Sequence, residues 1–507
     1  MSGNGLVTFP GHGDRKWLIS NVGVSHFKTY VTIQDGASSC PAKPGKKHRR
    51  FLRCDNTGNN VLTSKLDARF RPCCPAVLNS YKHIINRGKH IMKPVMGNVI
   101  VGQSGGPTAV INSSLAGVFK TAKDRGAKKV YGMRNGIQGL LEERVVDLSD
   151  HIRSSLDIDL LKRTPSSYLG SCRYKLPDIK DNREIYDRIF EILDKLEVEY
   201  FFYIGGNDSM DTIKKLSDYA ILNGSKIRFM GVPKTIDNDL AVTDHTPGFG
   251  SAAKYIASIT KEIIRDGLVY DQQNVTLIEI MGRNAGWLTG AAALATGEDC
   301  EGPDMLFLPE ITFDVDEFMK KVAELHKVKK SVVVAISEGV KVADGRYVCE
   351  LMDNIDFVDA FGHRQLTGTS RFLAQKISKE VGCKTRAIEF NSLQRCASHI
   401  VGRVDITEAY QVGGAAVKAA FEGETGKMII LKRVSDDPYL CVTDIYDVHK
   451  IANVEKKVPR EWINEAGDYV TDEFINYVRP LIQAELTPMM VDGLPRHLRL
   501  EDTPYGK

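Results

Sequence analysis

The sequence has no apolar run of the roughly eighteen residues that a membrane-spanning helix needs. Its ten cysteines include no CxxC pair, and no group of His and Cys has the spacing of a zinc site. These absences argue against a membrane-spanning chain, a disulfide framework and a zinc domain. Because no signal peptide is recognisable either, we expect a cytoplasmic protein with no membrane partner.

Glutamate is missing from residues 1–95, which contain 16 Lys and Arg and 4 Asp, a net charge of +12. The remaining 412 residues contain 52 basic and 60 acidic residues, a net charge of −8. Four interpretations of 1–95 stay open: a disordered tail, a nucleic-acid arm, a transit peptide, or residues that do not belong to the native protein. The dense basic run at 46–50 is short, so we expect no nucleic-acid partner and interpret 1–95 as a basic extension that is disordered or not native.

Order begins at Met96, after which short apolar and β-branched runs alternate with helical patterns. The run at 98–102 leads through a glycine-rich loop into a helical pattern over about 108–123. This alternation predicts an α/β protein with parallel sheets, in which ligands bind at the carboxyl edge of the strands. Further strands are expected at 200–204, 227–232, 275–280, 305–308, 331–336, 385–390 and 428–431, helices at 208–220 and 285–295, and an insertion at about 340–371.

Two glycine-rich loops follow predicted strands. The loop 102–107 matches neither GxxxxGK[ST] nor GxGxxG, which disfavours a P-loop nucleotidase and a dinucleotide site. Its backbone N–H groups and the helix that follows suit a bound phosphate, although a plain tight turn explains the loop equally well. The loop 205–209 adds oxygen ligands at a helix start, which suit a hydrated magnesium ion on phosphates or a simple N-cap.

A third segment, 235–239, places two carboxylates after a predicted buried strand, with Lys234 in front of it. One carboxylate can take a proton from a substrate hydroxyl while Lys234 offsets phosphate charge; an Asx turn is the alternative. Each candidate arginine also fits a solvated surface charge, and the candidate glutamate also fits a turn cap. The candidates are Arg173, Arg283, Arg386 and Arg395 for phosphate and Glu338 for sugar hydroxyls.

Five motifs occur in one order: Gly-Gly-Pro-Thr at 105–108, Gly-Gly-Asn-Asp-Ser at 205–209, Pro-Lys-Thr-Ile-Asp-Asn-Asp at 233–239, Met-Gly-Arg at 281–283 and Ser-Glu-Gly at 337–339. Together they resemble the phosphofructokinase family, and within it the pyrophosphate-dependent branch, over about 96–440. The resemblance implies two similar Rossmann-like α/β lobes with mainly parallel sheets and an active site in the cleft between them. It implies one catalytic region, 96–507, with the first lobe mainly at about 96–240, the second mainly at about 241–440 with crossovers, and a C-terminal segment after 440.

The same resemblance implies reversible, magnesium-dependent transfer of a phosphoryl group from pyrophosphate to the 1-hydroxyl of fructose 6-phosphate. Asp237 matches the general base, in a catalytic set completed by Lys234, Asp208, Arg283 and Arg173. The resemblance assigns pyrophosphate binding to Gly105, Gly106, Arg173 and Ser209. It assigns magnesium binding to Asn207, with the ion held partly through pyrophosphate and water. It assigns binding of the sugar phosphate to Thr235, Ile236, Asp239, Met281, Gly282, Glu338, Arg386, Ser392, Gln394 and Arg395.

The expected donor depends on two residues. Relatives that use ATP commonly have glycine at the positions of Asp208 and Lys234. The carboxylate of Asp208 would crowd and repel the α-phosphate of a nucleotide, whereas Lys234 adds positive charge beside a compact pyrophosphate. Because phosphoryl transfer depends on positioning and charge neutralisation, a change of donor needs no new covalent chemistry.

Three positions depart from the family pattern. Asn207 replaces a usual aspartate, and Asn274 and Ser392 replace an arginine and a histidine of bacterial ATP enzymes, which weakens the expected 6-phosphate site. An ATP-dependent 6-phosphofructokinase and a sedoheptulose-phosphate kinase therefore stay open. A non-catalytic regulatory subunit should have lost Asp237, Lys234 or Arg283, and all three are present. Active sites shared between subunits in relatives lead us to expect a homodimer or homotetramer.

Overall fold

The computed structural model describes residues 5–7, 17–25, 28–35, 97–352 and 366–500, and the chain divides into two units, Met1–Ile91 and Met92–Lys507. In the first unit, strands β1 (Gly5–Val7), β2 (Trp17–Ser25) and β3 (Lys28–Asp35) pair in antiparallel fashion. The rest of the extension at 1–95, including the basic run at 46–50, lies outside the described residues.

The second unit contains a seven-stranded sheet in the order β14-β13-β8-β7-β4-β5-β6. The five central strands are parallel, and the edge strands β6 and β14 are antiparallel to their neighbours. The central strands are built from buried, β-branched or aromatic runs, as parallel sheets covered on both faces require. The strands are β4 (Asn98–Gln103), β5 (Val130–Met133), β6 (Val145–Asp147), β7 (Val198–Gly205), β8 (Arg228–Pro233), β13 (Lys427–Asp436) and β14 (Tyr439–Asp447).

Helices cover both faces of this sheet. One hydrophobic cluster joins the sheet to α2 (Ile111–Asp124), α4 (Ser155–Arg163) and α12 (Arg403–Phe421). A second cluster joins the opposite face to α3 (Gly136–Leu141), α5 (Arg183–Lys195) and α6 (Asn207–Asn223). Helix α5 is amphipathic and contributes an apolar stripe to the core, whereas α2 and α12 also bury polar side chains such as Asn112 and Asp405.

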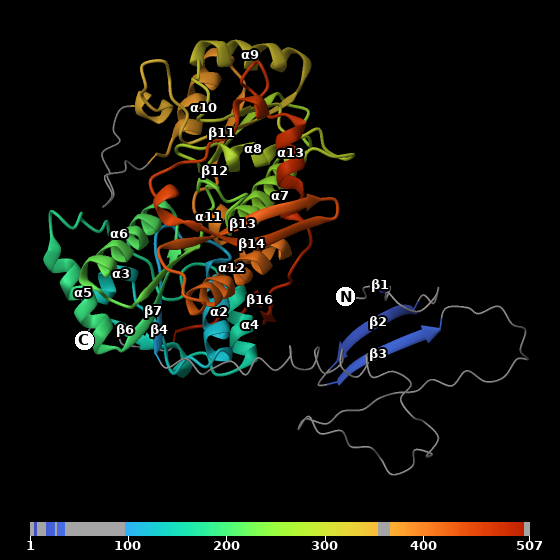
Figure 1. Ribbon diagram of the computed structural model, residues 1–507. Coiled ribbons are helices and arrows are strands. Elements are labelled where there is room, and N and C mark those ends of the chain that lie inside the picture. Colours follow the sequence, from blue (N-terminus) through green and yellow to red (C-terminus); the bar gives the residue numbers. More distant parts are fainter. Residues whose placement is uncertain (1–4, 8–16, 26–27, 36–96, 353–365, 501–507) are drawn as a thin grey trace, which may run out of the picture. The chain divides into compact units, whose positions relative to one another are not determined.

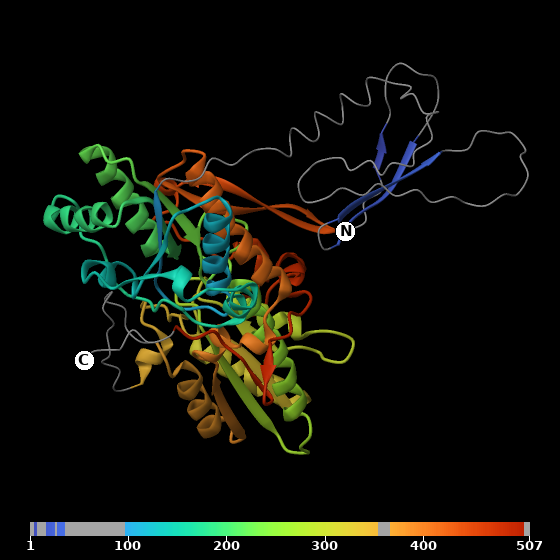
Figure 2. The same cartoon turned by 90° about the horizontal axis from the view of Figure 1, so that it is seen from below.

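Helices α2 and α12 lie side by side at unusually close range (Figure 1 and Figure 2). A Cβ atom at Gly117 of α2 would overlap the carbonyl oxygen of Tyr410, and one at Gly413 of α12 would overlap that of Ser114. The two glycines therefore let the backbones meet, and this contact ties a helix from the start of the lobe to one that comes much later in the sequence.

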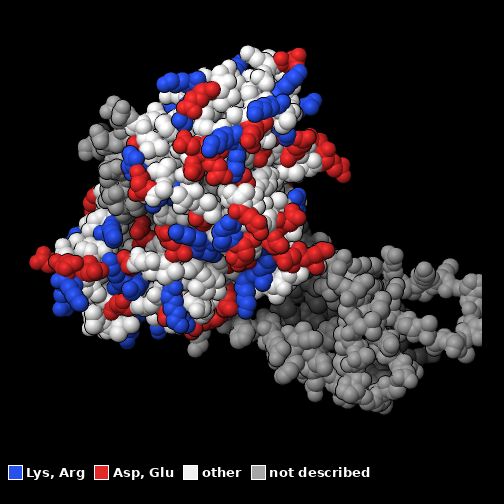
Figure 3. Space-filling model, turned by 90° about the horizontal axis from the view of Figure 1, so that it is seen from above, with Lys and Arg blue, Asp and Glu red and all other residues white. Residues whose placement is uncertain are grey.

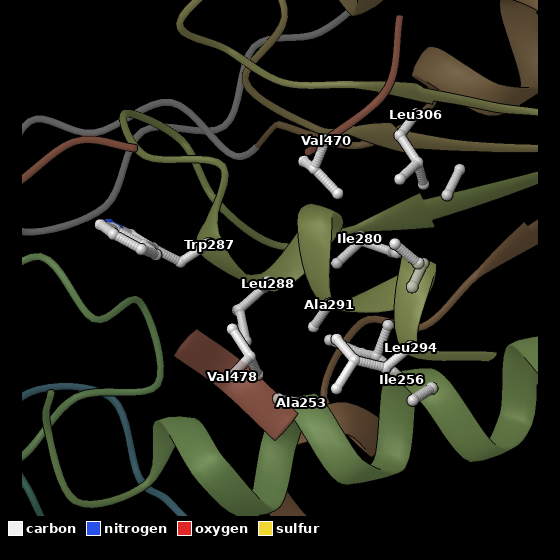
Figure 4. Packing of buried hydrophobic residues seen from close by; sticks show 14 of the residues in the cluster. Ala253, Ile256, Ile280, Trp287, Leu288, Ala291, Leu294, Leu306, Val470 and Val478 are labelled. Carbon is white, nitrogen blue, oxygen red and sulfur yellow. The ribbon is translucent and has the colours of Figure 1, made fainter. Parts of the chain in front are cut away.

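The second lobe contains a four-stranded, fully parallel sheet in the order β10-β11-β9-β12. One face packs on α7 (Phe249–Gly267), α8 (Trp287–Gly290), η2 (Ala291–Ala295) and α13 (Asp472–Val478), and the other on α9 (Val315–Val328) and α10 (Thr369–Glu380). Figure 4 shows Leu288 beside Val478, and Ile256 beside Leu294, in the first of these layers. The strands are β9 (Asn274–Ile280), β10 (Met305–Phe307), β11 (Ser331–Ser337) and β12 (Lys384–Glu389).

Mainly parallel sheets in two α/β lobes confirm the expected fold class. From Lys427 onward the chain forms β13, which pairs with β8 of the first sheet. The helix expected at 285–295 is a single α turn followed by a 3₁₀ helix, since its run of alanines packs tightly in the core. The predicted insertion contains η3 (Val348–Leu351) and the start of α10, and its residues 353–365 lie outside the described part.

Short elements complete the chain. No helix within the described ranges is long and apolar enough to cross a membrane. Basic and acidic side chains are interspersed over the face that Figure 3 shows. The short elements are η1 (Leu148–Asp150), α11 (Leu393–Cys396), η4 (Ser398–Ile400), η5 (Val448–Lys450), η6 (Arg460–Trp462), η7 (Arg479–Ile482), β15 (Met490–Val491) and β16 (Leu494–Pro495).

The variant Gly413→Ala tests the contact between α2 and α12. The added methyl group must push the helices apart, and we expect a loss of about 2 kcal/mol of stability and a lower melting temperature. Gly297→Ala is the control, because a Cβ atom there meets no atom closer than 3.6 Å. Equal melting temperatures for Gly413→Ala and the wild type would contradict the tight packing.

Candidate active site

The loops that follow β4, β7 and β8 meet at the carboxyl edge of the first sheet. The chain turns in opposite directions from the neighbouring strands β4 and β7, and such a switch point is where open α/β sheets bind ligands. Loops after β9 and β11 of the second sheet face the same cavity, whose volume is about 600 Å³. Its lining includes Gly105, Gly106, Pro107, Arg173, Gly206, Asn207, Asp208, Ser209, Lys234, Thr235, Ile236, Asp237, Asp239, Met281, Arg283, Asn284, Ala285, Glu338, Arg395, Asn453 and Glu455.

Lys234 is a buried residue that lines this cavity. Its side chain is 2% exposed, and Nζ donates a hydrogen bond to the carbonyl oxygen of Gly106 at 2.7 Å. Burial lowers the pKa of the ammonium group to about 8, although Asp237 and Asp239 oppose that shift. Gly105 has a φ of 74°, and a Cβ atom there would lie 3.4 Å from Nζ, so glycine leaves the space above the lysine open.

The segment 235–239 forms a tight turn held from two sides. Thr235 Oγ1 accepts a hydrogen bond from the backbone N–H of Asp237 at 3.1 Å and donates one to Asp237 Oδ2 at 3.3 Å. Asn238 adopts a left-handed φ of 54°, which asparagine tolerates, and its buried amide bonds to Tyr477 Oη and to the N–H of Thr246. The two carboxylates of the turn are thereby turned toward the cavity, while the asparagine between them anchors the backbone.

Three carboxyl groups in the cavity hold protons more strongly than usual. Burial raises the pKa of Asp237, while nearby Lys234 counteracts the shift. Burial and the charge of Asp237 raise the pKa of Asp239 to about 7, and the same two causes raise the pKa of Glu338 to about 8. A carboxylate with a raised pKa is a better proton acceptor at neutral pH than a solvated one.

The second lobe supplies the opposite wall. Gly282 has a φ of 138° and donates its N–H to Glu338 Oε1 at 3.5 Å, and Gln394 Oε1 accepts from the N–H of Met281 at 3.4 Å. Burial and the neighbouring charge of Arg173 lower the pKa of Arg395. Cationic groups therefore lie close enough to repel one another, an arrangement that an anionic ligand relieves.

The start of α6 forms the remaining wall. Asp208 is exposed to the cavity and Ser209 is buried. Asn207 Nδ2 donates to the carbonyl oxygen of Val454 at 3.1 Å, whereas its Oδ1 is buried without a hydrogen-bond partner. An orphaned amide oxygen fits a magnesium ligand, but the described residues contain no cluster of three His, Cys, Asp or Glu that would hold a metal ion alone.

Most residues singled out in the sequence line the cavity, and four do not. Gly282 and Gln394 lie just behind it, in the contacts given above. Ser392 is exposed, and its carbonyl oxygen accepts from the N–H of Arg395. Arg386 lines a separate hollow of about 270 Å³ beside α7 and β9, so one chain does not bring it to the cavity.

Six lining residues were not among the predicted site residues: Pro107, Gly206, Asn284, Ala285, Asn453 and Glu455. Asn284 directly follows the predicted Met-Gly-Arg motif, so its position next to that loop was the available signal. Asn453 and Glu455 belong to a stretch after β14 that has no motif and no periodicity. They reach the cavity because the chain crosses it after the seven-stranded sheet is complete, which local sequence does not encode.

Comparisons with known proteins agree with this geometry. The family model described as "Phosphofructokinase" matches residues 98–420. Relatives named pyrophosphate--fructose 6-phosphate 1-phosphotransferase share 40% identity over 80% of this chain and 96% of the protein in Halomonas elongata, and 41% over 81% and 98% in Xanthomonas campestris. A crystal structure titled pyrophosphate-dependent phosphofructokinase from Nitrosospira multiformis is 37% identical, with a TM-score of 0.72 over 82% of this chain and 98% of that one.

The raised pKa of Glu338 predicts a pH-dependent stability of the ligand-free protein. Because the folded-state pKa of about 8 exceeds the unfolded value of 4.5, the proton stabilises the fold fully below pH 4.5, and this stability is lost as the pH rises through 8. Glu338→Gln has no carboxyl group to titrate, so it does not lose this stability. The free energy of unfolding of the variant minus that of the wild type, measured by thermal unfolding, should therefore increase by on the order of 1–2 kcal/mol from pH 5 to pH 9. Exposed Glu324→Gln is the control, and a difference that stays constant with pH would contradict the assignment.

Proposed function

This chain belongs to the phosphofructokinase family, and we propose that it transfers a phosphoryl group from pyrophosphate to the 1-hydroxyl of fructose 6-phosphate. The products are fructose 1,6-bisphosphate and phosphate, and the reaction is reversible. The observation that carries the proposal is the buried Lys234 ammonium group, which shares one cavity with Asp237 and the exposed carboxylate of Asp208. The relatives in Halomonas elongata and Xanthomonas campestris, whose names state this reaction, support it.

In the proposed step, the 1-hydroxyl oxygen attacks the nearer phosphorus of pyrophosphate while Asp237 takes the hydroxyl proton. The bond between that phosphorus and the bridging oxygen breaks, and inorganic phosphate leaves. The raised pKa of Asp237 suits this role, because the same carboxyl can return the proton in the reverse direction. Thr235 orients the carboxylate through the bond to Oδ2.

Positive charge at the reacting phosphates comes from Lys234, Arg173 and Arg283, and Arg395 holds the sugar phosphate; all four line the cavity. The glycines at 105 and 106 let the donor approach the backbone, and the start of α6 adds N–H groups that favour an anion. We assign sugar binding to Met281, Glu338 and Gln394, with Ile236 and Asp239 at the reacting end. Asp208 limits the space for any group beyond the second phosphate.

Magnesium is part of the proposal. The unpartnered Oδ1 of Asn207 fits a ligand of a hydrated ion whose other ligands are water and pyrophosphate oxygens. When bound, the ion neutralises charge on the donor phosphates.

Two further proposals concern the state of the enzyme. Arg386 contacts the sugar 6-phosphate of a neighbouring subunit, which explains its distance from the cavity of its own chain and makes the enzyme a homodimer or homotetramer. Mixing inactive Arg386→Ala and Asp237→Asn subunits tests this, because only shared sites regain activity in hybrids.

The enzyme is cytoplasmic, in agreement with the free thiols of the six cysteines that lie in described residues.

A coupled assay of the purified protein with fructose 6-phosphate and magnesium tests the proposed function. We expect turnover with pyrophosphate and none with ATP, and Asp208→Gly should raise the ratio of ATP to pyrophosphate activity by roughly tenfold or more, because a like charge near the nucleotide phosphates is removed. Asp237→Asn, which keeps the size of the side chain, should lose activity with either donor by about 10²- to 10⁴-fold. Turnover of the wild type with ATP alone would overturn the donor assignment, and no turnover with either donor would overturn the proposed activity.

A further inference from the structure

A segment near the C-terminus crosses the cavity. We call residues 453–458 the C-terminal strap. On the side of the first lobe, Asn453 Nδ2 donates to Asp211 Oδ1 at 3.1 Å, and the carbonyl oxygen of Val454 accepts from Asn207 Nδ2 at 3.1 Å. The strap is therefore attached to the first turn of α6, the wall that the proposed function assigns to the donor.

On its other side the strap joins the catalytic turn and the second lobe. Lys456 donates its N–H to the carbonyl oxygen of Asp239 at 2.7 Å, and Glu455 Oε1 accepts from Asn284 Nδ2 at 2.7 Å. Trp287 Nε1 donates to the carbonyl oxygen of Lys456 at 3.0 Å. One short segment thus spans the donor wall, the turn that carries the base and the loop after β9.

The strap is held firmly. Lys456 Nζ donates to the carbonyl oxygens of Asp244 at 2.6 Å and Thr243 at 3.2 Å, and it lies 5.2 Å from the ring centre of Trp287. Further along, the N–H of Val458 donates to Glu310 Oε1 at 2.9 Å. With its backbone fixed at both ends, the strap presents Glu455 at a constant place on the cavity wall.

The charges in the cavity are unevenly placed. Lys234 is buried and Arg283 and Arg395 are half-buried. Arg173 and the carboxylates of Asp208 and Glu455 lie exposed, and the two carboxylates belong to the walls formed by α6 and the strap. A two-phosphate donor can meet the interior cations. A third phosphate adds negative charge to the same cavity, where Glu455 is a second carboxylate on the wall that repels it.

We propose that Glu455, positioned by the C-terminal strap, is a specificity-determining residue that limits donor length to two phosphates and disfavours longer linear polyphosphates. This inference rests on the proposed function, because it takes pyrophosphate as the donor. It differs from the role of Asp208, since it assigns selection to a segment that joins the two lobes and carries no recognisable motif. Transfer from tripolyphosphate would pass its terminal phosphoryl group to the same hydroxyl and release pyrophosphate.

The test compares kcat/KM for tripolyphosphate and pyrophosphate at one free magnesium concentration. We expect the ratio of tripolyphosphate to pyrophosphate to rise about tenfold in Glu455→Gln, which keeps the size of the side chain and an oxygen for Asn284 but removes the charge. Glu455→Ala should raise the ratio at least as much, because it also removes bulk. Glu461→Ala, an exposed change outside the cavity lining, should leave the ratio unchanged.

The possible outcomes distinguish a failure of the role proposed for Glu455 from a failure of the proposed function. A raised ratio in both Glu455 variants supports donor selection by charge, and a rise in Glu455→Ala alone supports selection by the bulk of the strap. Unchanged ratios in both variants, with the wild type active on pyrophosphate, overturn the role of the strap and leave the proposed function standing. A wild type that does not turn over pyrophosphate overturns the proposed function itself.

Discussion

The burial of one lysine ammonium group is the constraint on which the rest of the cavity depends. Lys234 is removed from water with one protein hydrogen bond to a carbonyl oxygen and with Asp237 and Asp239 nearby. Taking such a charge out of water costs several kcal/mol unless other charges compensate for it. A bound polyanion supplies that compensation. The buried charge of Lys234 therefore lowers the stability of the fold and at the same time favours binding of an anionic ligand.

The two lobes hold this arrangement from separate directions. The first sheet brings the glycine loops and the catalytic turn to one edge, and the close contact of α2 with α12 returns the chain to that lobe after β12 of the second sheet. The turn itself is held by Asn238, which bonds to Tyr477 and lies 3.4 Å from Lys456 Nζ. Residues far apart in the sequence therefore fix the two carboxylates that face Lys234.

Local sequence was sufficient to predict the strands that carry the site and most of its lining. The glycine loops, the Thr235–Asp239 turn and the Met-Gly-Arg loop follow buried strands, and a parallel sheet brings strand ends together. Glu455 and Asn453 could not be predicted in this way, because their place depends on a late crossing of the chain. The position of Arg386 away from the cavity also depends on tertiary structure, since β12 is an edge strand whose residue 386 faces a different hollow.

The titration of Lys234, followed by NMR of isotope-labelled lysine side chains, tests the central claim most directly. Lys456 is the internal control, because burial also lowers its pKa to about 8 while its side chain lies outside the cavity lining. Lys234→Arg and Lys456→Arg assign the two signals. We expect both lysines to titrate near pH 8 without ligand, and pyrophosphate to raise the pKa of Lys234 well above that of Lys456. Identical titration of Lys234 with and without pyrophosphate would show that its charge does not bind the donor.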